Sequence, residues 1–285
     1  MALLSFLFPR LAPPDFSKRA FLVGVARGGG GALLFSLPML MTMEMWWLGF
    51  TVEPGRLALL LLVLLPFLVL LAEESGFEKT PGFREKLRDA FVAFAIGILV
   101  STAILAVFGV LTPEQPLGNN LGMIAIQSVP ASIGALLARS QLGGQAAGDS
   151  AGSEDIRYLN ELALMAVGAL FLGLNVAPTE EVILIAYKMS PWHALALISL
   201  SLAVMHGFVF ALEFRGSHAV PEGHARGGAF WRFTLPGYVI GLLVSLYVLW
   251  TFGRTDGIGV VQTMMTVLVL GFPAAIGAAS ARLVL

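Results

Sequence analysis

The sequence of 285 residues contains no cysteine, and only 12% of its residues are charged. Without cysteine, the chain has no disulfides, no thiolate metal sites and no cysteine nucleophile. The formal net charge of −1 gives no basic excess of the kind that binds nucleic acid, so we expect no nucleic-acid partner. In place of charge the chain has apolar surface: 57% of the residues are hydrophobic, which is typical of a protein embedded in a lipid bilayer.

Long apolar segments recur along the whole chain. A helix needs about 20 apolar residues to cross the hydrocarbon core of a bilayer. Segments of this kind occur near residues 24–50, 56–72, 89–111, 119–138, 159–187, 191–212, 233–252 and 258–281. They predict an all-α, polytopic membrane protein with eight transmembrane helices. Before them, prolines interrupt a short apolar run in residues 1–20, and we expect this segment to lie at the membrane surface.

The two halves of the chain resemble each other. The stretch "GALLFSLPMLMTMEMWW" from Gly31 aligns without a gap with "GALFLGLNVAPTEEVIL" from Gly168, at an offset of 137 positions. Arg88 aligns with Arg232 at an offset of 144, and "PASIGALLAR" aligns with "PAAIGAASAR" at an offset of 143. Three matches in the same order indicate a duplication.

The duplication predicts the domain organisation. We expect a first four-helix repeat at residues 21–139 and a second at 158–285, joined by a flexible cytoplasmic linker at 140–157 that is rich in Gly, Ser and Ala. Each repeat has an even number of spans, so both begin on the same side of the membrane and the repeats are parallel.

Basic residues predict the orientation. All but three of the 17 lysines and arginines fall on one side of the predicted membrane; the exceptions are Arg56, Lys188 and Arg254. Lysine and arginine concentrate in cytoplasmic loops. We therefore expect both termini to be cytoplasmic.

Small residues recur at every fourth position of the third and seventh predicted spans. They are Ala93, Gly97 and Ser101 in the third, and Gly237, Gly241 and Ser245 in the seventh. Such flat faces let helix backbones approach closely in lipid. We interpret them as packing faces within the chain, with a contact in a homo-oligomer as the alternative.

Acids inside the predicted spans are the candidate functional residues. Glu44 lies on the order of 9 Å below the outer end of its predicted helix, at a rise of about 1.5 Å per residue, and Glu181 aligns with it. An ionised side chain at such a depth usually faces a protein interior or a wet cavity, where it marks an ion path.

Each of these acids follows a proline. Pro38 and Pro178 cannot donate backbone hydrogen bonds, so we expect the helices to break there. Thr42 and Thr179 precede the acids, Glu180 accompanies Glu181, and Asn175 is positioned to cap the second half-helix. Paired broken helices are typical of a transport site.

Two functions agree with this pattern. The first is a cation channel or cation-coupled transporter, with the proton as one candidate cation, in which the residues at the two helix breaks line the path. The second is a non-conducting membrane scaffold or accessory subunit, in which the glutamates are neutral clasps between helices. The sequence has no nucleophile and base at a recognisable spacing and no metal or cofactor motif, so we expect neither an enzyme nor a cofactor.

The residues at the first break carry a family resemblance. "LLFSLPMLMTMEMWW", together with the later "PTEE", resembles a family of bacterial integral membrane proteins of unassigned function, over most of the chain. The resemblance implies a bacterial inner-membrane location, and it brings no activity or site residue with it.

Overall fold

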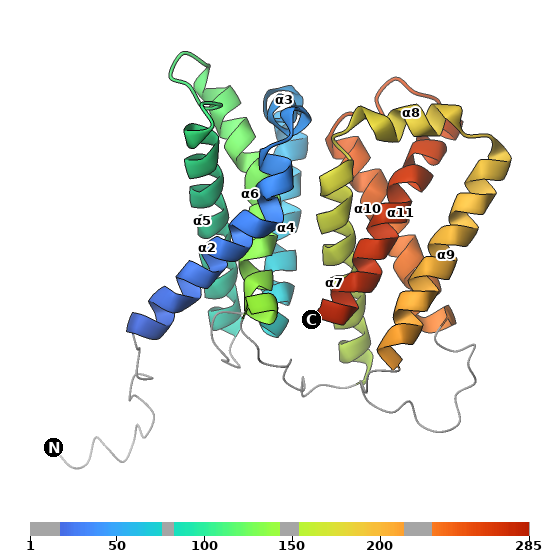
Figure 1. The fold of residues 1–285 in the computed structure, drawn as a ribbon, viewed down its shortest axis with the longest axis horizontal. Coiled ribbons are helices and arrows are strands. Elements are labelled where there is room, and N and C mark those ends of the chain that lie inside the picture. Colours follow the sequence, from blue (N-terminus) through green and yellow to red (C-terminus); the bar gives the residue numbers. More distant parts are fainter. Residues whose placement is uncertain (1–17, 76–82, 143–153, 214–229, 285) are drawn as a thin grey trace, which may run out of the picture.

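The computed structural model describes residues 18–75, 83–142, 154–213 and 230–284, and these residues form helices and short connections without strands (Figure 1). The first half of the chain contains α2 (Lys18–Leu40), α3 (Met43–Thr51), α4 (Pro54–Ser75), α5 (Phe83–Val107) and α6 (Leu117–Leu142). The second half contains α7 (Glu154–Val176), α8 (Glu180–Lys188), α9 (Pro191–Glu213), the π-helical turn η1 (Phe230–Thr234), α10 (Leu235–Thr251) and α11 (Val260–Val284).

Seven of these helices are long and apolar enough to cross a membrane by themselves. An eighth span results if the bent pair Gly24–Leu40 and Met43–Thr51 counts as one. The all-α, polytopic prediction is therefore confirmed. The first predicted span, 24–50, corresponds to this pair, in which α2 and α3 meet at 86°.

The helix boundaries of the second half also differ from the predicted ones, because a predicted span is again divided. The predicted span 159–187 is divided into α7 and the separate short helix α8. The described parts of the predicted linker, 140–142 and 154–157, belong to the ends of α6 and α7. The interfacial prediction for 1–20 falls almost entirely outside the described residues, although α2 already begins at Lys18.

One helix lies at the centre of each half. In the first half, α6 packs against α2, α3, α4 and α5, and in the second half α11 packs against α7, α8, α9 and α10. Buried Leu, Ile, Val, Ala and Met side chains fill the space between them. The third and seventh predicted spans, now α5 and α10, pack against α6 and α11 respectively.

The helix boundaries repeat at the offsets found in the sequence. The short helix α8 covers the residues of α3 displaced by 137 positions, and α9 begins 137 positions after α4. The end of α10 lies 144 positions after that of α5, and α11 begins 143 positions after α6.

The two halves lie side by side (Figure 1). Contacts between them are made chiefly by α4 with α7, with smaller contributions from α6 with α7 and from α4 with α10. The rings of Phe35 and Phe171 meet edge to face at 5.5 Å between centroids. Because most packing occurs within a half, the contact between the halves is narrow.

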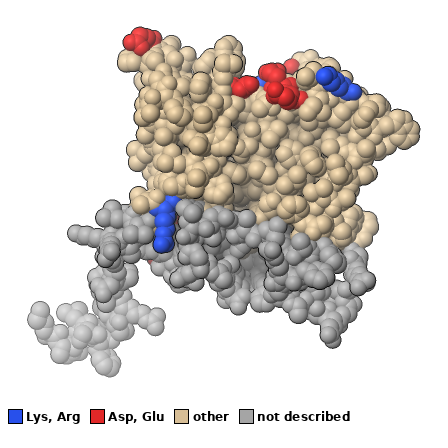
Figure 2. All heavy atoms as spheres, viewed as in Figure 1, with Lys and Arg blue, Asp and Glu red and all other residues tan. Residues whose placement is uncertain are grey.

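Charged side chains avoid the flanks of the described structure. Figure 2 shows a viewer-facing flank with almost none, whereas acidic side chains gather at the end that carries α3 and α8. We call this the α3/α8 end. An uncharged flank with charge at an end is the pattern expected of helices that cross lipid.

Candidate functional site

The break between α2 and α3 comes after Pro38, which lies inside α2. The helix continues to Leu40, and the chain turns at Met41 and Thr42. The prediction that the break lies at Pro38 itself is therefore displaced by a few residues. The backbone N–H of Thr42 donates to the carbonyl of Met39 at 3.1 Å, which tightens the last turn.

The break between α7 and α8 covers residues 177–179, and here the proline, Pro178, lies within the break itself. Both short helices have nine residues, and both begin after a threonine in an extended conformation, Thr42 and Thr179. Neither threonine caps its helix: Thr42 Oγ1 donates to the carbonyl of Pro38 at 2.6 Å, and Thr179 Oγ1 to that of Val176 at 2.9 Å. The hydroxyls therefore stabilise the ends of the long helices.

Asn175 does not cap α8. It lies inside α7, where its amide nitrogen donates to the carbonyl of Phe171 at 2.8 Å. The extended residue before α8 is Thr179, so the cap expected from the sequence is wrong by several residues.

Side chains from elsewhere in the fold satisfy the carbonyls at the two breaks. Gln127 of α6 donates its Nε2 to the carbonyl of Met39 at 3.0 Å, and the indole of Trp46 donates to that of Leu40 at 2.8 Å. In the second half, Arg254 donates to the carbonyl of Pro178 at 2.6 Å. Carbonyls at helix ends need such partners because the helix itself supplies none.

The candidate acids lie in the first turns of the short helices. Glu44 is half-buried at the start of α3, and Glu180 and Glu181 are exposed at the start of α8. The depth expected for Glu44 assumed a straight helix, and the 86° bend removes that assumption. Glu180 pairs with Arg254 at 2.6 Å between carboxylate and guanidinium.

The small-residue faces lie against other helices of the same half. A Cβ atom on Gly97 would lie 2.9 Å from the carbonyl oxygen of Ser128 on α6. One on Gly241 would lie 3.3 Å from the backbone nitrogen of Ala275 on α11. Both faces are buried; their further members are Ala93, Ser101, Gly237 and Ser245.

The first half also buries a row of polar side chains that sequence reasoning missed. They lie on α2, α5 and α6, all fully buried: Ser36, Ser101, Gln127, Ser128 and Ser132. We call them the polar row. Within the polar row, Gln127 Oε1 and Ser101 Oγ have no hydrogen-bond partner. Because Gln127 uses its nitrogen on Met39, the oxygen is the atom left without a donor.

The positions of the second half that align with the polar row hold mostly non-polar residues. Four of the five positions hold no polar side chain, being Gly173, Leu270, Gly271 and Ala275, and only Ser245 keeps one. The buried polar side chains of the described second half are all hydroxyls, at Ser201, Thr234, Ser245, Thr251 and Thr266. The amide nitrogen of Gln262 is also buried without a partner, although that side chain as a whole is only partly buried. Among the described residues, a fully buried amide side chain therefore occurs only in the first half.

A buried carboxylate lies on the same helix as part of the polar row. The Asp89 side chain is only 5% exposed and pairs with Arg88 at 3.3 Å. On α5, Asp89, Ala93, Gly97 and Ser101 follow one another at intervals of four residues, so they share one face. Asp89 lies toward the end opposite to α3 and α8. Its burial was not expected, since the sequence places it at the boundary of a predicted span beside a basic residue.

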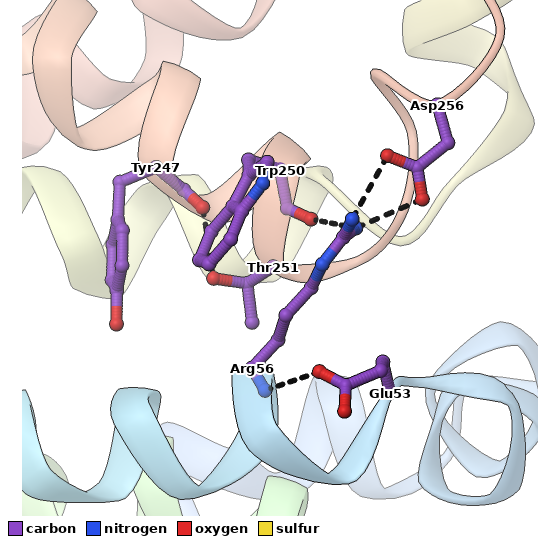
Figure 3. A network of polar contacts seen from close by, with 6 residues as sticks. All are labelled: Glu53, Arg56, Tyr247, Trp250, Thr251 and Asp256. Carbon is purple, nitrogen blue, oxygen red and sulfur yellow. Dashed lines mark hydrogen bonds and ion pairs between the residues drawn. The ribbon is translucent and has the colours of Figure 1, made fainter.

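At the α3/α8 end, Arg56 of α4 reaches into the second half (Figure 3). Its guanidinium makes two contacts with the Asp256 carboxylate, at 2.9 and 3.0 Å, and donates to the carbonyl of Trp250 at 2.7 Å. It also lies over the Trp250 ring, 4.8 Å from the centroid. Glu53 accepts the backbone N–H groups of Gly55 and Arg56, and these two hydrogen bonds lower the pKa of its carboxyl.

Within the described ranges, no group of three or more His, Asp or Glu side chains could hold a metal ion. What the arrangement offers is a set of buried neutral oxygen and nitrogen atoms on α2, α5 and α6, with Asp89 further along the same face of α5 and Glu44 at the start of α3.

Apolar helices of membrane-spanning length, a flank almost free of charge and charged residues at the helix ends define a polytopic α-helical integral membrane protein. The chain belongs to the family described as "Putative integral membrane protein (DUF2391)", which matches residues 24–285. The family resemblance noted in the sequence is thereby confirmed. No curated protein and no solved structure matches the chain.

Proposed function

We propose that this protein conducts protons across a bacterial inner membrane, along the polar row of its first half. Glu44 would receive the proton at the α3/α8 end and Asp89 at the opposite end. The single observation that carries the proposal is the polar row itself, with the unpartnered oxygen of Gln127 beside the α2–α3 break.

Two atoms of the polar row, Gln127 Oε1 and Ser101 Oγ, are buried without a hydrogen-bond partner. A buried acceptor without a donor costs free energy, and in a bilayer no solvent enters by default to compensate. Leu270, which aligns with Gln127 in the second half, is an example of an apolar side chain at the corresponding position. Polar side chains kept inside a membrane bundle usually belong to substrate or proton paths.

The tight packing favours a proton over a hydrated cation. A Cβ atom on Gly97 would already lie within 2.9 Å of Ser128, so an ion with its water shell has no room between α5 and α6. Hydroxyl and amide groups can accept and donate hydrogen bonds in turn. The serine hydroxyls now donate to carbonyls of their own helices, so conduction requires them to rotate.

The orientation and the repeat are parts of the same proposal. The matching helix boundaries and the matching central helices, α6 and α11, support two parallel four-helix repeats. The basic residues support cytoplasmic termini, which puts the α3/α8 end outside. In this arrangement the second half has the same helices as the first half but lacks the polar row.

The test measures proton flux into liposomes with an enclosed pH-sensitive dye. We expect the wild-type protein to conduct above empty liposomes, and Glu44→Gln, Asp89→Asn and Gln127→Leu to lose most of that flux while remaining folded. Glu181→Gln is the matched control, because Glu181 aligns with Glu44 in the half without the row. Equal losses from both glutamate variants would favour a symmetric path through both breaks instead.

The scaffold function is the second candidate. It is favoured by the ion pair between Glu180 and Arg254, in which an acid at a break acts as a clasp. Wild-type protein that is folded but conducts no protons, sodium or potassium would support this role, with an exposed surface of the bundle binding a partner or a second copy.

A further inference from the structure

The contacts of Arg56 differ from the other ion pairs of the α3/α8 end in joining the two halves. Arg56 belongs to α4, whereas Asp256 and Trp250 belong to the end of α10 and the loop that follows it, about 200 positions away in the chain. The Glu180–Arg254 pair, in contrast, stays within the second half. The wider contact between α4 and α10 is small.

The Arg56 guanidinium is held from several directions at once. It forms a bidentate ion pair with the Asp256 carboxylate, donates a hydrogen bond to the Trp250 carbonyl and lies over the Trp250 indole ring (Figure 3). The Arg56 side chain is 21% exposed and the Asp256 side chain is 56% exposed, so solvent reaches the pair, and the number and geometry of the contacts, rather than burial, distinguish it from a single surface ion pair. Paired geometry of this kind is directional and is lost when the partners shift.

The backbone that carries Arg56 is itself fixed. Glu53 binds the N–H groups of Gly55 and Arg56, so the first turn of α4 is closed by its own cap. Only Val52 and Glu53 separate this turn from the end of α3. A displacement of the start of α4 would therefore also displace α3, which carries Glu44.

We propose that Arg56, Asp256 and Trp250 form a latch that holds the two halves together at the α3/α8 end, and that its release lets α4 and α3 move away from the second half. Two packed bodies with a narrow contact can shift as units when a bond between them is broken. Through Glu44 the latch would control access to the polar row, and this part alone rests on the proposed proton conduction.

The test uses the absence of cysteine in the chain. Spin labels on Leu59→Cys of α4 and Leu246→Cys of α10, both exposed, report the distance between the halves in the full-length protein in liposomes. We expect Arg56→Gln and Asp256→Asn each to add a population at longer distance. The double variant should add no more than either single variant, because the two residues act as one unit.

Glu180→Gln is the control, since it removes an ion pair of the same end that stays within the second half, by a change outside the loop that carries Asp256. It should leave the distance unchanged. An unchanged distance in Arg56→Gln, or additive effects in the double variant, would overturn the latch. Faster proton flux in Arg56→Gln would support its control of access. Wild-type protein without flux would overturn the proposed conduction, and the distances would still decide the latch.

Discussion

Gly168 on α7 and Gly277 on α11 cross so closely that a Cβ atom on either would overlap the carbonyl oxygen of the other. In the first half, a Cβ atom on Gly134 of α6 would lie 2.7 Å from the carbonyl oxygen of Gly31 on α2. Gly31 aligns with Gly168, and Gly134 with Gly277. The same two helices therefore cross at the same two glycines in both halves, as expected where association in lipid depends on close backbone packing.

This crossing predicts that Gly277→Ala destabilises the protein, by about 1–3 kcal/mol, the usual cost of overpacking. Gly173→Ala is the control on α7, because a Cβ atom there meets nothing within 4 Å. It should be neutral or slightly stabilising, since alanine favours helix more than glycine does. Thermal unfolding in detergent measures both. Similar midpoints for the two variants would contradict the crossing.

The cap of α4 predicts a pH-dependent stability. Hydrogen bonds from Gly55 and Arg56 lower the pKa of Glu53 below its value in the unfolded chain. The ionised cap therefore stabilises the fold above the unfolded pKa, and this contribution is lost as the pH falls through the lower, folded pKa. Glu53→Gln should be less stable than wild type at neutral pH, and the difference should shrink in acid.

The comparison of thermal midpoints between pH 7 and pH 3 measures this difference. Glu114→Gln, a change at another carboxylate of the same end, serves as the control for general charge effects. A gap between wild type and Glu53→Gln that stays constant with pH would rule out the cap as its cause.

Arg254 should matter more than its acidic partner. Arg254→Gln removes both the pair with Glu180 and the hydrogen bond to the carbonyl of Pro178. Because a hydrogen bond from a charged group contributes about 1.5–3 kcal/mol, we expect a clear loss of stability. Glu180 is 67% exposed, so Glu180→Gln should cost less than about 1 kcal/mol. Chemical denaturation of the two variants checks the order, and a larger effect from Glu180→Gln would reverse the interpretation.

The orientation predicts which side reaches each end of the bundle. Single cysteines at Glu114 and Leu117, next to the start of α6, should react with an impermeant maleimide added outside whole cells. A cysteine in the segment 143–153 should react only after the membrane is opened. Reaction of the latter from outside would exclude parallel repeats with cytoplasmic termini.

Hydropathy and proline were sufficient to predict much of the fold. The backbone N–H and C=O groups of a membrane span must form their hydrogen bonds within one helix. The length and the apolar composition of a span can therefore be recognised from a continuous stretch of sequence. Proline removes a backbone donor wherever it occurs, and this places the breaks within a few residues of Pro38 and Pro178. The short helix α8 lies at the offset of 137 given by the gapless match, although Asn175 had been expected to cap it.

Contacts between distant segments decided the rest. The 86° turn of α3 depends on its packing against α6, and no local property of residues 41–42 sets that angle. Gln127 lies in an apolar segment where nothing nearby in the sequence points to Met39, 88 positions away. Asp89 is buried because α5 turns its face toward other helices. Local chemistry thus determined which segments cross the membrane and where they break, whereas the packing of α6 against its neighbours decided which polar atoms lie inside and which remain without partners.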